Sequence, residues 1–114
     1  VTAAELAARI DQTLLRPDST RRDCIAFCQE AAPHGFATVC VLPAWVADAV
    51  DVLEGTDTRV CTVVGFPHGG ASASAKQVEA ATVVADGADE VDMVCNVSAL
   101  KSGSDILVFD EIQA

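Results

Sequence analysis

The sequence predicts an α/β fold built on a parallel β-sheet. Short β-forming segments alternate four times with segments of helical pattern along the 114 residues. Because each parallel crossover needs a helix to cover the sheet, this alternation indicates consecutive β/α units. Hydrophobic residues make up 51% of the chain and aromatic residues only 4%, which favours small aliphatic side chains between helices and sheet. No linker or low-complexity tract interrupts the pattern, so residues 1–114 are expected to form one structural unit.

The first unit is preceded by a short N-terminal helix over residues 2–9, which contains good helix formers and a Thr at its start. A strand is predicted over residues 10–15, and the Arg-Pro-Asp sequence that follows it is expected to end the strand. Ser19 or Thr20 can cap the following helix, and Pro33 ends that helix. Cysteines at positions 24 and 28 share one face of it and are expected to pack as small buried side chains.

The second unit combines a strand over residues 36–42 with a helix over residues 43–53, whose leading Pro suits a first helical turn. In the third unit, a strand over residues 59–64 precedes a helix that Ser72 or Ser74 opens. The pattern of that helix places four residues on one apolar stripe: Val78, Ala81, Val84 and Ala85.

The fourth unit contains an acidic strand within residues 87–96 and a final amphipathic helix after residue 104, with Lys101 in the loop between them. The apolar residues of the final helix are Ile106, Leu107, Phe109 and Ile112. Acids on a strand are costly to bury unless their face lines a polar cavity. The alternative for this segment is an edge strand with a solvated acidic face.

Two architectures fit four successive β/α units. One is an open, doubly wound sheet, and the other is the first half of an eightfold β/α barrel (a TIM barrel), which takes roughly 250 residues. Asp11 and Thr13 share a face of the first strand, and Glu90 and Asp92 share a face of the fourth. Such one-sided polarity favours the barrel, whose strands line an interior site. The third strand leaves two possible inward sets, Cys61 with Val63 and Thr62 with Val64.

Asp92 is the candidate catalytic residue. It lies near the C-terminal end of its strand, where barrels and open α/β sheets place their sites, and a partly buried carboxylate there can transfer protons. A metal is the weaker choice, because His34 and His68 both lie in loops without metal-ligand spacing. Residues 65–70 match neither a phosphate loop nor a dinucleotide fingerprint. The expectation is therefore a site without a metal or cofactor.

The chain contains two lysines, Lys76 and Lys101. Either could form an imine in principle, but a reactive lysine needs activation by burial or by a neighbouring cation. Neither has a basic neighbour in the sequence, so surface roles are expected for both.

Charge and cysteine content limit the partners and the compartment. Seven basic and 17 acidic residues give a formal net charge of −10, which disfavours nucleic acid and anionic membranes as partners. Five cysteines form no Cys-x-x-Cys pair, and reduced thiols are typical of the cytosol. No signal peptide or membrane-length apolar run is recognised. A soluble, cytoplasmic protein is the expectation.

Five segments taken together resemble the deoxyribose-phosphate aldolase family. They occur in that family's order and cover most of the chain up to Gly103: residues 10–15, 39–43, 62–69, 76–80 and 87–94. The combination is specific, although each segment alone is a weak signal. Gln12 stands where many members of the family have His, and residues 104–114 match less clearly.

The resemblance implies a class I, Schiff-base aldolase on a β/α barrel. Such an enzyme splits 2-deoxy-D-ribose 5-phosphate into glyceraldehyde 3-phosphate and acetaldehyde in deoxyribonucleotide breakdown, without a metal. It further implies that Asp92 relays protons through water, and that Asp11, Thr13, Leu15 and Cys40 lie around the phosphorylated sugar. The imine-forming lysine, the second lysine beside it and the phosphate loops of the family lie on later strands.

The expectation is thus that residues 1–114 form the N-terminal portion of such a barrel, inactive alone and completed by a C-terminal half or by self-association. A rival from another class is a noncatalytic half-barrel module that associates through its open sheet edges. A third possibility is a self-contained, doubly wound domain that binds a small anion, which the one-sided polarity of the first and fourth strands disfavours.

Overall fold

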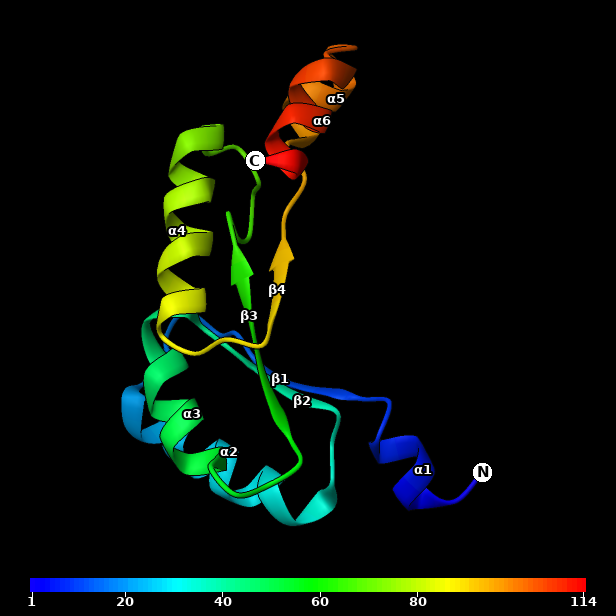
Figure 1. The fold of residues 1–114 in the computed structure, drawn as a ribbon, viewed down its shortest axis with the longest axis vertical. Coiled ribbons are helices and arrows are strands. Elements are labelled where there is room, and N and C mark those ends of the chain that lie inside the picture. Colours follow the sequence, from blue (N-terminus) through cyan, green and yellow to red (C-terminus); the bar gives the residue numbers. More distant parts are fainter.

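A computed structural model describes residues 1–114 and contains one four-stranded sheet whose neighbouring strands are all parallel. The strands lie in the order β1-β2-β3-β4, which is the order that successive crossovers in one direction give (Figure 1). Their bounds are β1 (Asp11–Leu14), β2 (Thr38–Val41), β3 (Arg59–Val64) and β4 (Glu90–Met93). The first and last strands are consequently the two edges of the sheet.

Six α-helices accompany the sheet, and short 3₁₀ turns lie at Ala32–His34 and Pro43–Trp45. The helices are α1 (Ala3–Ala7), α2 (Arg21–Ala31), α3 (Val46–Leu53), α4 (Ala73–Ala85), α5 (Val97–Lys101) and α6 (Asp105–Gln113). Thr2 and Thr20 begin α1 and α2 with complete capping boxes, and Ser72 caps α4. Ser19 is not the cap of α2, because its hydroxyl donates to the carbonyl of Arg16 at 2.6 Å.

The apolar core lies on one face of the sheet, which α2, α3 and α4 cover (Figure 1). The strands contribute four buried valines: Val39, Val41, Val60 and Val64. Cys24 and Cys28 of α2 pack into this core with 1% and 0% of their surface exposed, in the role the sequence predicts. The small side chains allow the helices to approach the sheet closely, so this face holds most of the buried surface.

The predicted apolar stripe of α4 is wrong. Val78 and Val84 are 66% and 57% exposed, whereas the buried residues of the helix are Lys76 and Val83. The reason is the position of the helix at the β3–β4 edge of the sheet, where only a narrow stripe of α4 packs against the strands (Figure 1). The apolar flank of α4 therefore faces outward.

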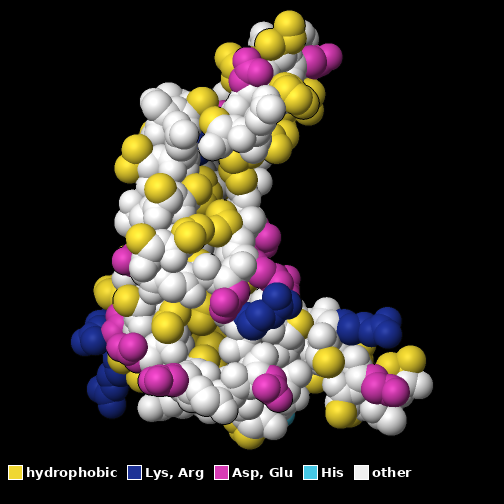
Figure 2. Space-filling view, viewed as in Figure 1, with side chains coloured by type: hydrophobic (Ala, Val, Ile, Leu, Met, Phe, Trp, Pro, Cys, Tyr) yellow, Lys and Arg dark blue, Asp and Glu magenta, His cyan; other side chains and the backbone are white.

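The segment after β4 also differs from the prediction. Residues 97–101 form the short helix α5, which Asn96 caps through its side chain, so Lys101 ends a helix rather than lying in a loop. Helices α5 and α6 extend beyond the end of the sheet, with no strand beneath them (Figure 1). We define the α5–α6 apolar surface as the exposed residues Val97, Leu100, Ile106, Leu107, Phe109 and Ile112. Figure 2 shows hydrophobic side chains gathered over this end of the molecule.

The overall shape is elongated. The radius of gyration is 15.4 Å, compared with about 13 Å for a compact domain of roughly 100 residues, and the extents are 45 × 33 × 24 Å. Only 23 of the 114 residues are buried, so much of the sheet and of the terminal helices lacks a covering layer. None of the helices has the length and apolar character needed to cross a membrane.

Candidate active site

The face of the sheet opposite the core, here called the open face, carries most of the polar strand residues. It includes Asp11 and Thr13 from β1, Thr38 and Cys40 from β2, Arg59, Cys61 and Val63 from β3, and Glu90 and Asp92 from β4. The alternation predicted for the first and fourth strands is therefore present. In β3, the pair Cys61 and Val63 lies on the open face, while Thr62 faces the core and donates its hydroxyl to the Val41 carbonyl.

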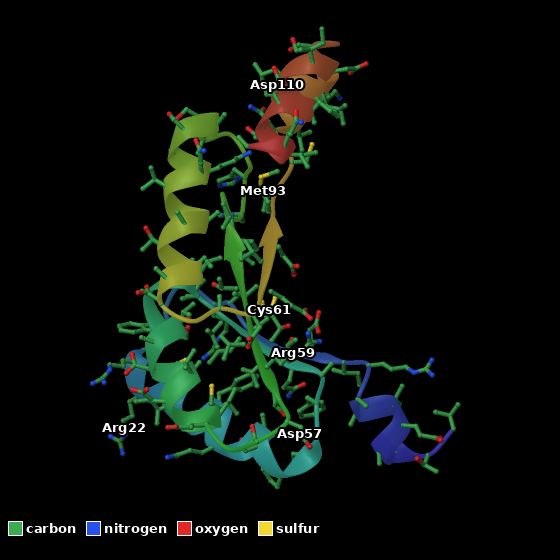
Figure 3. The ribbon with its side chains drawn as sticks, in the orientation of Figure 1. Arg22, Asp57, Arg59, Cys61, Met93 and Asp110 are labelled. Atoms are coloured by element: carbon green, nitrogen blue, oxygen red, sulfur yellow. The ribbon has the colours of Figure 1, made fainter.

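Three strands bring two thiols and a carboxylate together at the centre of the open face. Cys40 and Cys61 are directly paired in the β2–β3 register, and Asp92 is paired with Val63 in the β3–β4 register. The Sγ atoms of both cysteines and a carboxylate oxygen of Asp92 lie within 4.8 Å of one another. Cys61 lies near the middle of the sheet, on the strand that also carries Arg59 (Figure 3). The cysteines are buried and Asp92 is exposed, so solvent reaches the cluster from the β4 side.

Burial keeps both thiols of the cluster protonated. It raises the pKa of Cys40, and the negative charges of Asp92 and Asp11 raise that pKa further. The pKa of Cys61 is also raised, first by burial and then by Cys40 and Asp92 beside it. At neutral pH the cluster therefore contains two neutral thiols beside the Asp92 carboxyl group. Neither cysteine is set up as a thiolate nucleophile.

The remaining residues expected at the site surround this cluster. Thr13 pairs with Cys40 in the β1–β2 register, and Leu15 packs against Cys40, Cys61 and Val63. Asp11 opens β1, two residues before Thr13 on the same face, and the Thr38 hydroxyl donates to its Oδ1 atom at 2.8 Å. The structure thus gathers Thr13, Leu15, Cys40 and Asp92, with Asp11 toward the start of the strand.

The three acids of the fourth unit have different surroundings. Asp89 accepts a hydrogen bond from the backbone amide of Val60 at 2.9 Å, which ties the start of β4 to β3. Glu90 pairs with Arg59 at 2.8 Å across the same two strands. Asp92 has no ion-pair partner. Among these acids, Asp92 is therefore the one available to a ligand.

The surface role expected for Lys76 is wrong. Its side chain is only 1% exposed, and Nζ donates to Glu111 Oε1 at 2.7 Å, to the Gly69 carbonyl at 2.7 Å and to the Val94 carbonyl at 2.9 Å. A lysine can be buried at this position because all three of its donors find acceptors. The seven-residue spacing between Lys76 and the buried Val83 was the sequence signal that could have placed it on the inner face of α4.

The loop between β3 and α4 lies at the C-terminal ends of the strands and contains His68. Together with Lys76 and Glu79 of α4, this loop lines a cavity of about 350 Å³. Glu79 accepts a hydrogen bond from the Gly65 amide at 2.8 Å, and the Lys76 amine donates to the Gly69 carbonyl, so the start and the middle of the loop are fixed to α4. His68 is exposed on this loop, and His34 is exposed in the 3₁₀ turn that follows α2. The two histidines are not among the residues that gather at the cluster.

Four parallel strands in sequential order, with polar groups gathered on one face, define consecutive units of a β/α-barrel enzyme. The chain belongs to the DeoC/LacD family of aldolases, whose family model matches residues 6–114. The deoxyribose-phosphate aldolase of Geobacillus sp. (strain WCH70) is 50% identical over 109 residues, which are 96% of this chain and 49% of the relative. The enzyme of Clostridium botulinum (strain Okra / Type B1) is 48% identical over 96% of this chain and 51% of its own length.

Solved structures agree with this assignment. A crystal structure from Coccidioides immitis, assigned as a deoxyribose-phosphate aldolase, superposes with a TM-score of 0.93 at 38% identity, over 98% of this chain and 44% of that one. The tetrameric deoxyribose phosphate aldolase of Aeropyrum pernix gives a TM-score of 0.79 at 37% identity, over 85% and 42%. The chain thus spans about half the length of the relatives it matches.

Proposed function

We propose that residues 1–114 supply the proton-transfer part of a class I deoxyribose-phosphate aldolase. The observation that supports this role is the position of Asp92, which is exposed on the open face within 4.8 Å of two thiols and lacks an ion-pair partner. The relatives carry the name of this aldolase. The proposed reaction splits 2-deoxy-D-ribose 5-phosphate into glyceraldehyde 3-phosphate and acetaldehyde through a Schiff base.

The chemistry assigned to Asp92 is movement of protons. An amine that adds to the substrate aldehyde gives a carbinolamine, whose oxygen must be protonated before it leaves as water. Asp92 provides that proton through an intervening water molecule, and its carboxylate takes a proton back when the imine is hydrolysed. The two neutral thiols beside it add no competing charge, since burial keeps them protonated.

The substrate is proposed to lie over the open face. Thr13 and Leu15 then border it from β1, with a hydroxyl and an apolar wall, and Cys40 forms part of its floor. Asp11 accepts the Thr38 hydroxyl at 2.8 Å, which fixes its carboxylate and leaves its other oxygen for a sugar hydroxyl. The exposed Asp11 and Asp92 disfavour an anion between them, so the substrate phosphate is assigned to groups outside these residues.

The imine-forming amine is likewise assigned to a lysine outside residues 1–114. Lys76 already donates to three acceptors, and Lys101 lies at the end of α5 on the surface. The remaining barrel units, with that lysine, come from the same polypeptide or from another chain, whereas a second copy of this chain could pair with the edges of β1 and β4 but would bring no further lysine. The chain alone is therefore expected to be inactive.

The experiment combines the 114-residue chain with the separately expressed second half of the Geobacillus relative. Borohydride with acetaldehyde should trap an adduct on the second half and none on this chain. Asp92→Asn should slow turnover of deoxyribose 5-phosphate by roughly 10² or more. Glu90→Gln is the matched control on the same face and strand, and it should leave turnover near normal. Trapping at Lys76 or Lys101, or normal turnover of Asp92→Asn, would contradict the proposal.

The α5–α6 apolar surface favours a second candidate function, a noncatalytic interaction module. Ile106 and Phe109 are 78% and 63% exposed, and exposed apolar patches of this kind mark association surfaces. The two functions differ in turnover. A module should associate with its partner but should never gain turnover of deoxyribose 5-phosphate when a second half is supplied.

A further inference from the structure

The strongest feature that the aldolase proposal leaves unexplained is the donor set of the Cys40–Cys61–Asp92 cluster. Two sulfur atoms and one carboxylate oxygen, from three different strands, lie within 4.8 Å of one another. The sequence contains no metal-ligand spacing at these positions because the sheet, and not the local chain, brings the residues together. Sequence reasoning that looked for local spacing therefore disfavoured a metal.

The geometry is close to what a tetrahedral cation requires. Zinc binds sulfur at about 2.3 Å and carboxylate oxygen at about 2.0–2.2 Å, so two sulfur ligands of one tetrahedral ion lie about 3.8 Å apart. The donors of the cluster already lie within 4.8 Å. Cys40 and Cys61 are directly paired residues of neighbouring strands, so their side chains project from adjacent positions on the same face.

The electrostatics favour a divalent cation once the thiols ionise. Two thiolates and the Asp92 carboxylate would gather three negative charges within 4.8 Å of one another, and a dication placed between them neutralises most of that charge. Soft thiolate ligands select zinc-like ions, whereas magnesium and calcium require more oxygen ligands than the cluster contains.

We propose that Cys40, Cys61 and Asp92 form a binding site for a thiophilic divalent cation such as Zn²⁺ or Cd²⁺. The cation takes two sulfur ligands and one oxygen ligand, and its fourth position faces solvent on the exposed Asp92 side. Binding converts two thiols into thiolates and releases two protons to solvent, while Asp92 binds as the carboxylate. The ion has no part in the aldol chemistry of the proposed function, since it occupies the carboxylate that this function uses for proton transfer.

The test uses Cd²⁺ alone with the reduced 114-residue chain. Titration should give one ultraviolet cadmium–thiolate absorption per chain, and two protons should appear in a weakly buffered solution. Cys40→Ser or Cys61→Ser should remove the stoichiometric signal. Asp92→Asn, an exposed change that leaves the core intact, should weaken binding by about tenfold or more while the absorption stays.

The controls are the other thiols, which lie outside the cluster. Cys95→Ser and Cys24→Ala should bind Cd²⁺ like the unmodified chain, and circular dichroism checks that each variant is folded. Full binding by the Cys40→Ser/Cys61→Ser double variant, or loss of binding in Cys24→Ala, would place the metal elsewhere and overturn the inference. Binding is measured without turnover, so failure of the metal site is distinguishable from failure of the aldolase proposal.

Discussion

Lys76 and Glu111 form an ion pair between side chains that are 1% and 0% exposed, with Nζ and Oε1 2.7 Å apart and 35 positions between them in sequence. The same amine holds the Gly69 and Val94 carbonyls. One cation thus joins α4, the loop before it, the end of β4 and α6. Glu111 Oε2 is buried without a partner, so the pair is only partly satisfied.

Removal of one member of this pair should strongly destabilise the chain. Lys76→Met leaves the Glu111 carboxylate buried without a counter-charge, and such changes cost about 3–5 kcal/mol in the free energy of unfolding. Lys76→Met combined with Glu111→Leu should recover much of the loss, because no charge is then left alone. Urea unfolding followed by circular dichroism measures both effects.

The control for the ion pair is Arg21→Ala. Arg21 contacts Asp48 at 2.6 Å, but its side chain is 64% exposed and solvent screens the pair, so its loss should change the free energy of unfolding far less than the loss of Lys76. A Lys76→Met effect as small as that of Arg21→Ala would show that the buried pair does not hold α6 in place.

Alkaline pH should destabilise the chain through Cys40 and Cys61. Their pKa values are raised in the folded state, so the unfolded chain loses these protons first as pH rises above the ordinary thiol value of 9.0. Stability is therefore full below pH 9 and falls above it, by about 1.4 kcal/mol per pH unit for each thiol. Urea midpoints between pH 7 and 10 should fall more steeply than in Cys40→Ser/Cys61→Ser, and parallel curves would remove the thiols as the cause.

Gly69 should tolerate no side chain. Its φ is +71°, and a Cβ there would lie 2.1 Å from the Cys95 carbonyl oxygen, a backbone atom that cannot move aside. Gly69→Ala should therefore cost about 2 kcal/mol or more. Gly70 provides a neighbouring control, because a Cβ there meets nothing within 4 Å. Equal thermal midpoints for Gly69→Ala and Gly70→Ala would contradict the close approach of this loop to the end of β4.

The α5–α6 apolar surface should drive self-association of the 114-residue chain. Phe109→Ser should raise the dissociation constant for self-association by about tenfold or more, because a buried phenyl group contributes about 2 kcal/mol. Sedimentation velocity over a concentration series measures the change. Val78→Ser on α4 is the matched control, since Val78 is 66% exposed and Phe109 is 63% exposed, and Val78 lines a different hollow from Ile112. An equal effect of both variants would show that exposure alone, and not this surface, drives association.

The sequence predicts the sheet well because each strand is followed by a helix and each strand after the first is preceded by a turn signal. The faces of β1 and β4 could also be predicted, since Asp11 and Asp92 mark the polar side of each strand. In β3 that argument fails, because Thr62 is polar but satisfies its hydroxyl against the Val41 carbonyl inside the core. The alternation of polar and apolar residues along one strand does not reveal a hydrogen bond to a neighbouring strand.

The helices show a different limit. Helical spacing finds α4 but not its buried face, because Val78 and Val84 look like core residues while Lys76 looks like a surface residue. The face of α4 that is buried depends on Glu111, 35 residues from Lys76 in sequence, and on two backbone carbonyls that accept from the same amine. The Cys40–Cys61–Asp92 cluster has the same character, since its members come from three strands and meet only in the folded sheet.

Because the sheet has a packed face and an open face, constraints from folding and constraints from activity fall on different residues of the same strand. Val91 and Met93 of β4 pack against the core, while Asp92 between them is exposed on the open face. New chemistry can therefore arise at such exposed alternate positions without loss of the fold. In a complete substitution scan of β4, tolerance for folding should rise and fall with a period of two residues, and selection for activity should constrain the positions that selection for folding leaves free.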